Sequence, residues 1–229
     1  MRVTNPHAVN GCKGDHMVMT LEAKVIRVLI GRHPLVTLPQ KQASPDAAYL
    51  VSERVPAVRA TLEGLEGDRH AGFTRRADAR VPQYPRGTEI HNSRHVSLIG
   101  EEELAHIAAN LGVPVVAPEW IGANLVLRGI TNLSHLPPMT RISFPEETAI
   151  ALEGENHPCV YPGKAIQHHY PDRPDVGKHF PKAAYHLRGV VGWIERPGMI
   201  REGDIVRITV PEQAPYRVAG TGDAVTSAH

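Results

Sequence analysis

Short apolar runs separated by turn residues dominate this chain and predict a fold rich in β-strands. Residues 22–30 bring Val, Ile and Leu close together, and residues 58–65 alternate apolar with polar side chains, as half-buried strands do. A turn around Pro197-Gly198 is expected to join the last two strands. The remaining strands are expected at 94–99, 124–127, 140–144, 148–152, 189–194 and 204–210.

Helical periodicity is clear in one segment only, residues 100–110. Glutamates fill its first turn, where the helix dipole favours them, and Gly112 is placed to end it. Four prolines restrict residues 160–187 to short helices, of which 182–187 is the best candidate. The apolar face of the first helix consists of Leu104, Ile107, Ala108 and Leu111.

The order of these elements predicts the fold class. The strands lack the regular intervening helices of a parallel α/β sheet, and many short strands with Gly/Pro turns favour a barrel or a sandwich. We expect one mainly β domain with a few helices over residues 20–211. Residues 1–19 and 212–229 are expected to be disordered tails.

Composition and charge exclude several functions. The net charge is +1, which gives no electrostatic reason to expect nucleic-acid binding. No apolar run approaches the ~18 residues of a membrane span, and the N-terminus lacks the apolar core of a signal peptide. Two cysteines do not make a disulfide framework, so a reducing cytoplasm is the simplest location.

The strongest chemical signal is Cys159, which directly follows a proline in the polar run 154–159. A thiol on a fixed loop can act as a nucleophile, a sulfur carrier or a ligand to a soft metal, and nearby cations favour its reactive thiolate form. His157, Lys164 and Arg188 are candidate cationic neighbours. The alternative is that Cys159 is a small buried apolar residue, as many free cysteines are.

Two further signals concern anions. The turn at 67–70, Gly-Asp-Arg-His, combines one carboxylate with two cationic side chains, although the same residues suit an ordinary solvated turn. Arg94, Arg128 and Arg188 each lie at a strand edge or beside a glycine, where a guanidinium can reach a phosphate or carboxylate. Each arginine alone is more often part of a surface ion pair.

Histidines concentrate in the same part of the chain as Cys159. They offer ligands for zinc or copper in principle, but their spacing matches no compact zinc motif, and the alternative is a set of surface histidines in a Pro-rich loop. The candidates are His157, His168, His169, His179 and His186, together with Cys159.

Six segments, taken in order, resemble the MOSC domain, a family named for the C-terminal domain of molybdenum-cofactor sulfurase. No segment is specific alone, but six in the family's order are. The resemblance covers about residues 58–210. The segments are Gly64-Leu65-Glu66-Gly67-Asp68-Arg69-His70, Ser93-Arg94-His95-Val96-Ser97-Leu98-Ile99, Gly122-Ala123-Asn124-Leu125, Gly154-Glu155-Asn156-His157-Pro158-Cys159, Leu187-Arg188-Gly189-Val190 and Gly198-Met199-Ile200-Arg201-Glu202-Gly203-Asp204-Ile205-Val206.

The resemblance implies both a fold and a chemistry. MOSC domains are mostly antiparallel, closed β-barrels similar to the barrel domain of pyruvate kinase. The family's cysteine, here Cys159, is proposed to carry sulfur, or to bind molybdenum in relatives that reduce N-hydroxylated compounds. Thiolate is a soft ligand that suits molybdenum, and the phosphate of the molybdopterin would need cationic or N–H donors.

By resemblance, Cys159 is the expected catalytic residue and molybdenum ligand. The chain departs from the family at Gly122-Ala123-Asn124, where Gly-Glu-Asn is common. An insertion at 74–92 and a His/Pro-rich segment at 165–181 lengthen two loops that can reshape or cover a pocket. The expected contacts to the molybdenum cofactor are Gly67, Asp68, His70, Arg94, Ser97, Asn124, Asn156 and Arg188.

Three functions follow as hypotheses. The first is a molybdenum-cofactor enzyme that reduces a small N-hydroxylated substrate with electrons from a partner reductase. The second is a sulfur carrier that receives a persulfide on Cys159 from a donor protein, and the third is a non-catalytic binding domain. The full sulfurase's aminotransferase-like domain is missing, so no pyridoxal phosphate is expected in this chain.

Overall fold

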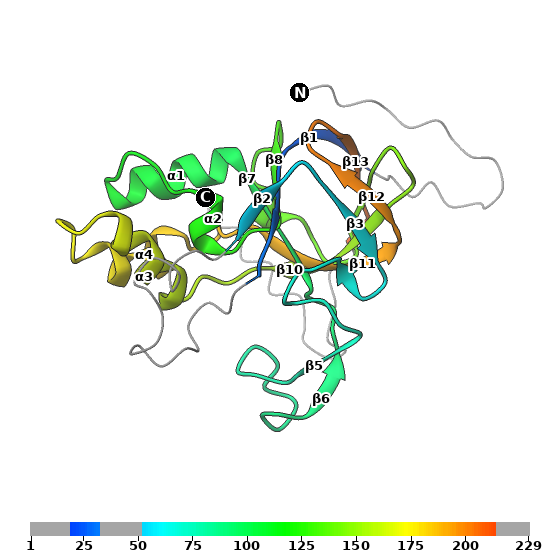
Figure 1. Ribbon diagram of the computed structural model, residues 1–229, viewed down its shortest axis with the longest axis horizontal. Helices are drawn as coiled ribbons and strands as arrows, with labels where there is room; N and C mark the ends of the chain where they lie inside the picture. The colour runs from blue at the N-terminus through cyan, green and yellow to red at the C-terminus, as the bar shows by residue number, and fades with distance from the viewer. Residues whose placement is uncertain (1–18, 33–51, 214–229) are drawn as a thin grey trace, which may run out of the picture.

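A computed structural model describes residues 19–32 and 52–213, which form a β-barrel with helices packed against one side (Figure 1). Seven strands close the barrel in the order β13-β9-β10-β11-β7-β8-β1, and β13 pairs again with β1 to complete the ring. This confirms the predicted barrel. Cys12 and nearly all of both expected tails lie outside the described residues.

The elements have the following bounds. The strands are β1 (Met19–Ile30), β2 (Glu53–Val55), β3 (Ala57–Thr61), β4 (Gly64–Leu65), β5 (Thr74–Arg76), β6 (Glu89–His91), β7 (Val96–Gly100), β8 (Leu125–Arg128), β9 (Arg141–Ser143), β10 (Ala149–Glu155), β11 (Val190–Arg196), β12 (Gly198–Arg201) and β13 (Ile205–Val210). The helices are α1 (Glu101–Leu111), α2 (Pro118–Ile121), α3 (Val160–His169) and α4 (Val176–Ala183), with a 3₁₀ turn η1 (Leu133–His135).

All strand pairs of the barrel are antiparallel except β7 and β8, which run parallel. A parallel pair needs a long crossover, and here α1 and α2 supply it between the two strands. The prediction of a mostly antiparallel barrel is therefore confirmed, and β7–β8 is its one parallel pair. The same crossover places the end of α2 beside the start of β8.

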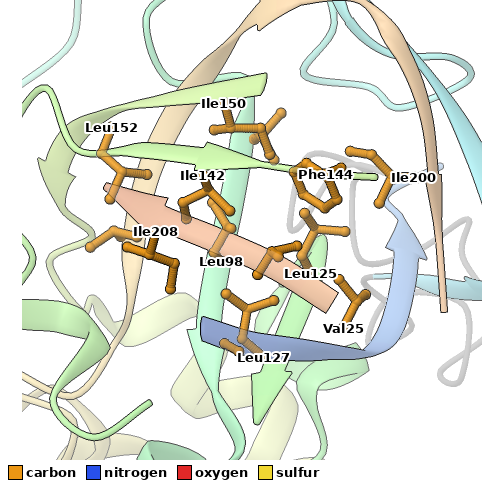
Figure 2. Packing of buried hydrophobic residues seen from close by; sticks show 14 of the residues in the cluster. Val25, Leu98, Leu125, Leu127, Ile142, Phe144, Ile150, Leu152, Ile200 and Ile208 are labelled. Atoms are coloured by element: carbon orange, nitrogen blue, oxygen red, sulfur yellow. The ribbon is translucent and has the colours of Figure 1, made fainter. Parts of the chain in front are cut away.

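The interior of the barrel is filled by side chains from alternate strand positions (Figure 2). On β8, Leu125 and Leu127 point into the barrel, whereas Val126 belongs to a second apolar cluster outside it. That second cluster joins the barrel wall to α1 and α4 through residues such as Ile107 and Phe180. Strand β7 is buried throughout because both of its faces are covered.

The predicted first helix is confirmed at Glu101–Leu111, and its apolar face is buried as expected. Gly112 ends it in the left-handed conformation, with φ of 64°. The prediction of a helix at 182–187 is wrong, since α4 ends at Ala183. Val176 and Phe180 are buried in the second apolar cluster. Their burial stabilises a helix at 176–183 in preference to 182–187 and outweighs the unfavourable Pro181.

Two other segments bear on the sequence prediction. Helix α3 agrees with the expectation of short helices at 160–187, and Pro162 is its third residue, where an N–H has no helical partner to lose. The turn expected around Pro197 leads directly into a further strand, β12, which pairs with β3. Within the described residues, no helix is long and apolar enough to cross a membrane.

Candidate functional site

A cleft of about 350 Å³ forms where segments far apart in the sequence meet. Its walls come from the turn at 69–71, the loop at 121–124 between α2 and β8, the loop at 156–162 and the residue Arg188. A further wall is the excursion, which we define as residues 72–92 and which contains the β5–β6 hairpin. The predicted insertion at 74–92 therefore contributes directly to the cleft.

Cys159 lies in this cleft at the N-cap of α3. Strand β10 shifts register between Leu152 and Gly154, and such bulges redirect the chain at the end of a strand. The following loop is held by the backbone N–H of Asn156, which donates to the carbonyl of Gly189 at 2.9 Å. The thiol is half-buried, so it faces the cleft without being sealed from it.

Arg188 is the most buried cation of the cleft, with only 5% of its surface exposed. Its Nη2 donates to the carbonyl of Ile121, while its Nη1 is buried and has no hydrogen-bond partner among the described residues. Burial lowers the pKa of Arg188 to about 10, and the negative charge of the Cys159 thiolate acts in the opposite direction. Arginine and thiol are therefore close enough to influence each other electrostatically.

The backbone beside Arg188 is fixed by a short buried network. The amide of Gly189 donates to Ser134 Oγ at 2.6 Å, and the amide of Ser134 donates to Glu103 Oε1 at 2.6 Å. Burial raises the pKa of Glu103, which also accepts the N–H of Gly100 at the N-cap of α1. The network connects the first turn of α1 to Gly189, which lies between Arg188 and the start of β11.

Arg94 supplies a second guanidinium, which forms no hydrogen bond or ion pair with the described residues. Burial lowers its pKa to about 10, and the charges of Arg80 and Arg75 act in the same direction. The cleft as a whole is strongly positive: among the described residues, five arginines and one aspartate line it. Such an excess of donors and charge suits an anionic ligand.

Beneath the cleft lies a fully bonded polar network centred on Asn124. Its Nδ2 donates to Asp68 Oδ2 at 2.8 Å and to the carbonyl of Leu29 at 3.2 Å. Its Oδ1 accepts from the amide and the hydroxyl of Ser97, at 3.0 and 3.1 Å. Since every polar group of the Asn124 side chain is occupied, its main role in this structure is to hold the cleft wall together.

Asp68 connects that network to the turn at 67–70. Its carboxylate accepts from the amide of Gly31 at 2.7 Å, the amide of His70 at 2.8 Å and the ring Nδ1 of His70 at 2.9 Å. Burial alone raises the pKa of Asp68, but the interactions with His70 and Gly31 outweigh it and hold the pKa below its usual range.

The variant Asp68→Asn is expected to lose about 3 kcal/mol of stability at neutral pH, because one amide oxygen cannot accept from all of the donors around it. The wild-type carboxylate stabilises the fold above its unfolded-state pKa, and this contribution is lost as the pH falls through the lower folded-state pKa. Urea unfolding at neutral and acidic pH measures both effects. The acidic loss of stability should be smaller in the variant, and the exposed Asp172→Asn should match wild type at neutral pH.

The structure brings most of the predicted site residues to the cleft. Among the residues that line it are His70, Arg94, Ser97, Asn124, Asn156, Cys159 and Arg188. Asp68 lies behind the wall, and Gly67 is an exposed turn residue with φ of 80° outside the lining. Arg128, a weaker candidate, pairs with Glu101 on the surface.

Sequence reasoning missed the arginines of the excursion. Arg75 and Arg80 line the cleft, and the only signal for them was the arginine-rich composition of the insertion. The His/Pro-rich segment at 165–181 instead packs as α3 and α4 and gives the cleft no residue. Ala123, where the family often has a glutamate, is fully buried in the apolar helix layer.

Of the five candidate histidines, His157 lines the cleft with Cys159, and the other four do not. His179 pairs with Asp175, His186 pairs with Glu155, and the ring of His169 stacks on Trp120. Over residues 19–32 and 52–213, no three His, Cys, Asp or Glu side chains form a group that could hold a metal ion. The zinc or copper hypothesis therefore has no support in the part of the chain that is described.

Fold and site together define a class: a small β-barrel protein with one cysteine in an arginine-lined cleft. The family model of the MOSC domain matches residues 85–207. The chain belongs to the MOSC domain family, which confirms the resemblance found in the sequence.

One relative is the protein YuaD of Bacillus subtilis (strain 168), whose name refers to metal-sulfur cluster biosynthesis. It is 40% identical over 163 residues, which are 71% of this chain and 85% of YuaD. The crystal structure of YuaD superposes with a TM-score of 0.77 at 35% identity and covers 86% of this chain and all of that one. A crystal structure of a hypothetical protein, at 18% identity and a TM-score of 0.50, covers 82% of this chain and 69% of its own and shares the fold alone.

Proposed function

We propose that the cleft binds the molybdenum cofactor, that Cys159 supplies a thiolate ligand to the metal, and that the protein reduces N-hydroxylated compounds with electrons from a partner reductase. The observation that carries the proposal is the pairing of one half-buried cysteine with the buried Arg188, whose Nη1 has no partner among the described residues. The half-buried Arg94 lines the same cleft. Family membership agrees with it.

The residues of the cleft fit this cofactor in two respects. The phosphate of molybdopterin requires cationic donors, and Arg188 offers a buried Nη1 without a partner, while the guanidinium of Arg94 is unpaired among the described residues. The metal requires a soft ligand, and Cys159 is the one cysteine of the described residues. When bound, the metal would supply the two-electron chemistry that no side chain here can provide.

The chain's own residues would orient and hold the cofactor. Arg94 and Arg188 would hold its anionic end, and the Asn124 network would keep the wall behind Ser97 rigid. Cys159 is the N-cap of α3, so the helix N-terminus, which attracts anions, faces the same end of the cleft as the proposed metal ligand. His70 and Asn156 line the cleft and are proposed contacts to the cofactor. Asp68 would act indirectly, through its hydrogen bonds to His70 and Asn124. Gly67 would act through the shape of the turn at 67–70.

The second candidate is a sulfur carrier. Cys159 is accessible from the cleft, and the guanidinium of Arg188 would stabilise a persulfide anion on it. The name of YuaD, which refers to metal-sulfur clusters, favours sulfur chemistry in a related protein. In this case a donor protein would transfer a sulfane sulfur to the thiolate of Cys159, and a reductase partner would not be needed.

Elemental analysis for molybdenum tests the first candidate, on protein made in a host that produces the cofactor. We expect about one metal per chain in wild type, a loss of at least about tenfold in Cys159→Ala because a thiolate ligand to a soft metal is removed, and full retention in Cys12→Ala. The Cys12 variant controls for the loss of a thiol as such. Circular dichroism establishes that each variant is folded.

The outcomes separate the three functions. Equal molybdenum in wild type and Cys159→Ala, or none in a folded wild type, contradicts the metal-ligand role. A persulfide mass shift on Cys159 in metal-free protein supports the sulfur carrier. Neither metal nor persulfide, with Cys159→Ala behaving like wild type, leaves a non-catalytic binding domain.

A further inference from the structure

The excursion projects from the barrel as the β5–β6 hairpin (Figure 1), and several of its residues line the cleft. Strands β5 and β6 pair over three residues each, and the segment between them is closed by backbone bonds between Ala77 and Thr88 and between Gly87 and Ala77, at 2.7 and 2.9 Å. Its base is fixed by Asn92, whose Nδ2 donates to the carbonyls of His70 and Gly72. Its side chains are therefore held in place relative to the cleft.

Two arginines of the excursion line the cleft and share one carboxylate. Arg80 Nη1 lies 2.7 Å from Asp78 Oδ2, and Arg75 Nη1 lies 3.7 Å from the same oxygen. Burial alone raises the pKa of Asp78, but the hydrogen bonds and charge of Arg80, with the charge of Arg75, outweigh it and keep the pKa low. Asp78 is thus an internal counter-ion for two guanidiniums and neutralises only one positive charge.

Unused donor capacity remains on this wall. Arg75 Nε is buried and has no hydrogen-bond partner among the described residues. The charges of Arg75 and Arg80 lower the pKa of Arg94, and the charge of Arg80 also lowers that of Arg188. Arg75 and Arg80 therefore act on the same cleft as Arg94 and Arg188, and its volume lies within the ~300–1,000 Å³ typical of ligand pockets.

We propose that Arg75 and Arg80, arranged around Asp78, form a second anion subsite opposite Arg94 and Arg188, and that the ligand of the cleft carries two anionic groups, as a diphosphate ester does. This inference rests on the proposed function in one respect, namely that the ligand binds in the same cleft. The first subsite takes one anionic group near Cys159, and the excursion takes the other by displacing the carboxylate of Asp78 from its arginines.

The probes are inorganic phosphate and pyrophosphate, titrated by calorimetry into metal-free protein at fixed ionic strength. Wild type is expected to bind pyrophosphate about tenfold or more tightly than phosphate, since charge-assisted bonds form at both subsites. In Arg75→Gln/Arg80→Gln this preference should fall to about twofold or less, while the affinity for phosphate changes little. The control is Arg86→Gln, which removes one charge from an exposed position of the same excursion outside the cleft.

The variant Asp78→Asn is expected to bind pyrophosphate more tightly, the opposite of the effect of removing the arginines. It removes the internal counter-ion but keeps Oδ1, which accepts the backbone N–H of Arg80 at 2.8 Å and shapes the turn. Pyrophosphate should bind about threefold to tenfold more tightly than to wild type, because it no longer competes with a carboxylate. Loss of affinity in this folded variant would contradict the counter-ion role.

Equal binding of the two probes by wild type, or a preference unchanged in Arg75→Gln/Arg80→Gln, would overturn the second subsite. The metal-free protein makes this test independent of molybdenum. If the protein prefers pyrophosphate but takes up no molybdenum, the proposed function is overturned and the second subsite stands. If it takes up molybdenum but shows no preference for pyrophosphate, the second subsite is overturned and the proposed function stands.

Discussion

The variant Gly189→Ala is expected to lose more than about 4 kcal/mol of stability, enough to unfold a marginally stable domain. Gly189 has φ of 80°, and a Cβ there would lie 1.9 Å from the carbonyl oxygen of Leu98 and 2.9 Å from its carbonyl carbon. That carbonyl is backbone of β7, which pairs with β11 next to this position, so no side-chain rotation can relieve the overlap. Urea unfolding followed by circular dichroism measures the loss.

A matched control is Gly203→Ala. Gly203 has φ of 96°, but a Cβ there would meet no atom within 4 Å. It should therefore lose only the conformational cost of a left-handed residue, about 1–2 kcal/mol. Similar losses in the two variants would show that β7 and β11 can separate locally, and would contradict the rigid presentation of Arg188.

Replacing Arg188 by methionine is expected to weaken phosphate binding by about tenfold to a hundredfold, since a hydrogen bond to a charged group contributes about 1.5–3 kcal/mol. The stability should change by less than about 1 kcal/mol or increase, because methionine fills a similar volume without a buried charge. The carbonyl of Ile121 loses its donor, which limits the gain. Calorimetric titration with phosphate and urea unfolding measure the two effects separately.

The comparison variant is Arg86→Met, which removes an exposed charge outside the cleft and should change neither quantity appreciably. If Arg188→Met lost stability and kept its affinity for phosphate, Arg188 would be a structural support for the loop at Ile121. Equal loss of affinity in both variants would mean that only net charge matters.

Much of the candidate site was predictable because it follows local signals. A cysteine after a proline and arginines beside strand ends mark positions where the backbone presents a side chain in a defined direction. That Asn124 and Ser97 contact a cofactor stays a prediction. In this structure their side chains form hydrogen bonds mainly with each other and with other residues of the cleft wall. The bonding state of a buried amide depends on partners far along the chain, such as Leu29 and Asp68.

The excursion and the helix layer were not predictable in the same way. Arg75 and Arg80 lie in a stretch without periodicity, and no local signal tells whether such arginines face solvent or a cleft. Helix α3 begins at Val160 and accommodates Pro162 in its first turn, whereas α4 contains Pro181 and forms where Phe180 can be buried. In α4, tertiary contacts outweigh a local helix propensity that is unfavourable by about 1–3 kcal/mol.

The sequence by itself predicted the barrel strands and the first helix, because alternation, capping and turn chemistry are encoded within a few residues. That pattern left a barrel and a sandwich open, and the resemblance of six segments to the MOSC domain implied the closed barrel and the role of the cysteine loop. Only the tertiary structure decided that five arginines from distant segments line one cleft with Cys159, and that Arg188 is buried with a donor that no described residue accepts. Those facts depend on the closure of the barrel and on packing between distant segments, which set burial and electrostatic environment and leave no periodic trace in the chain.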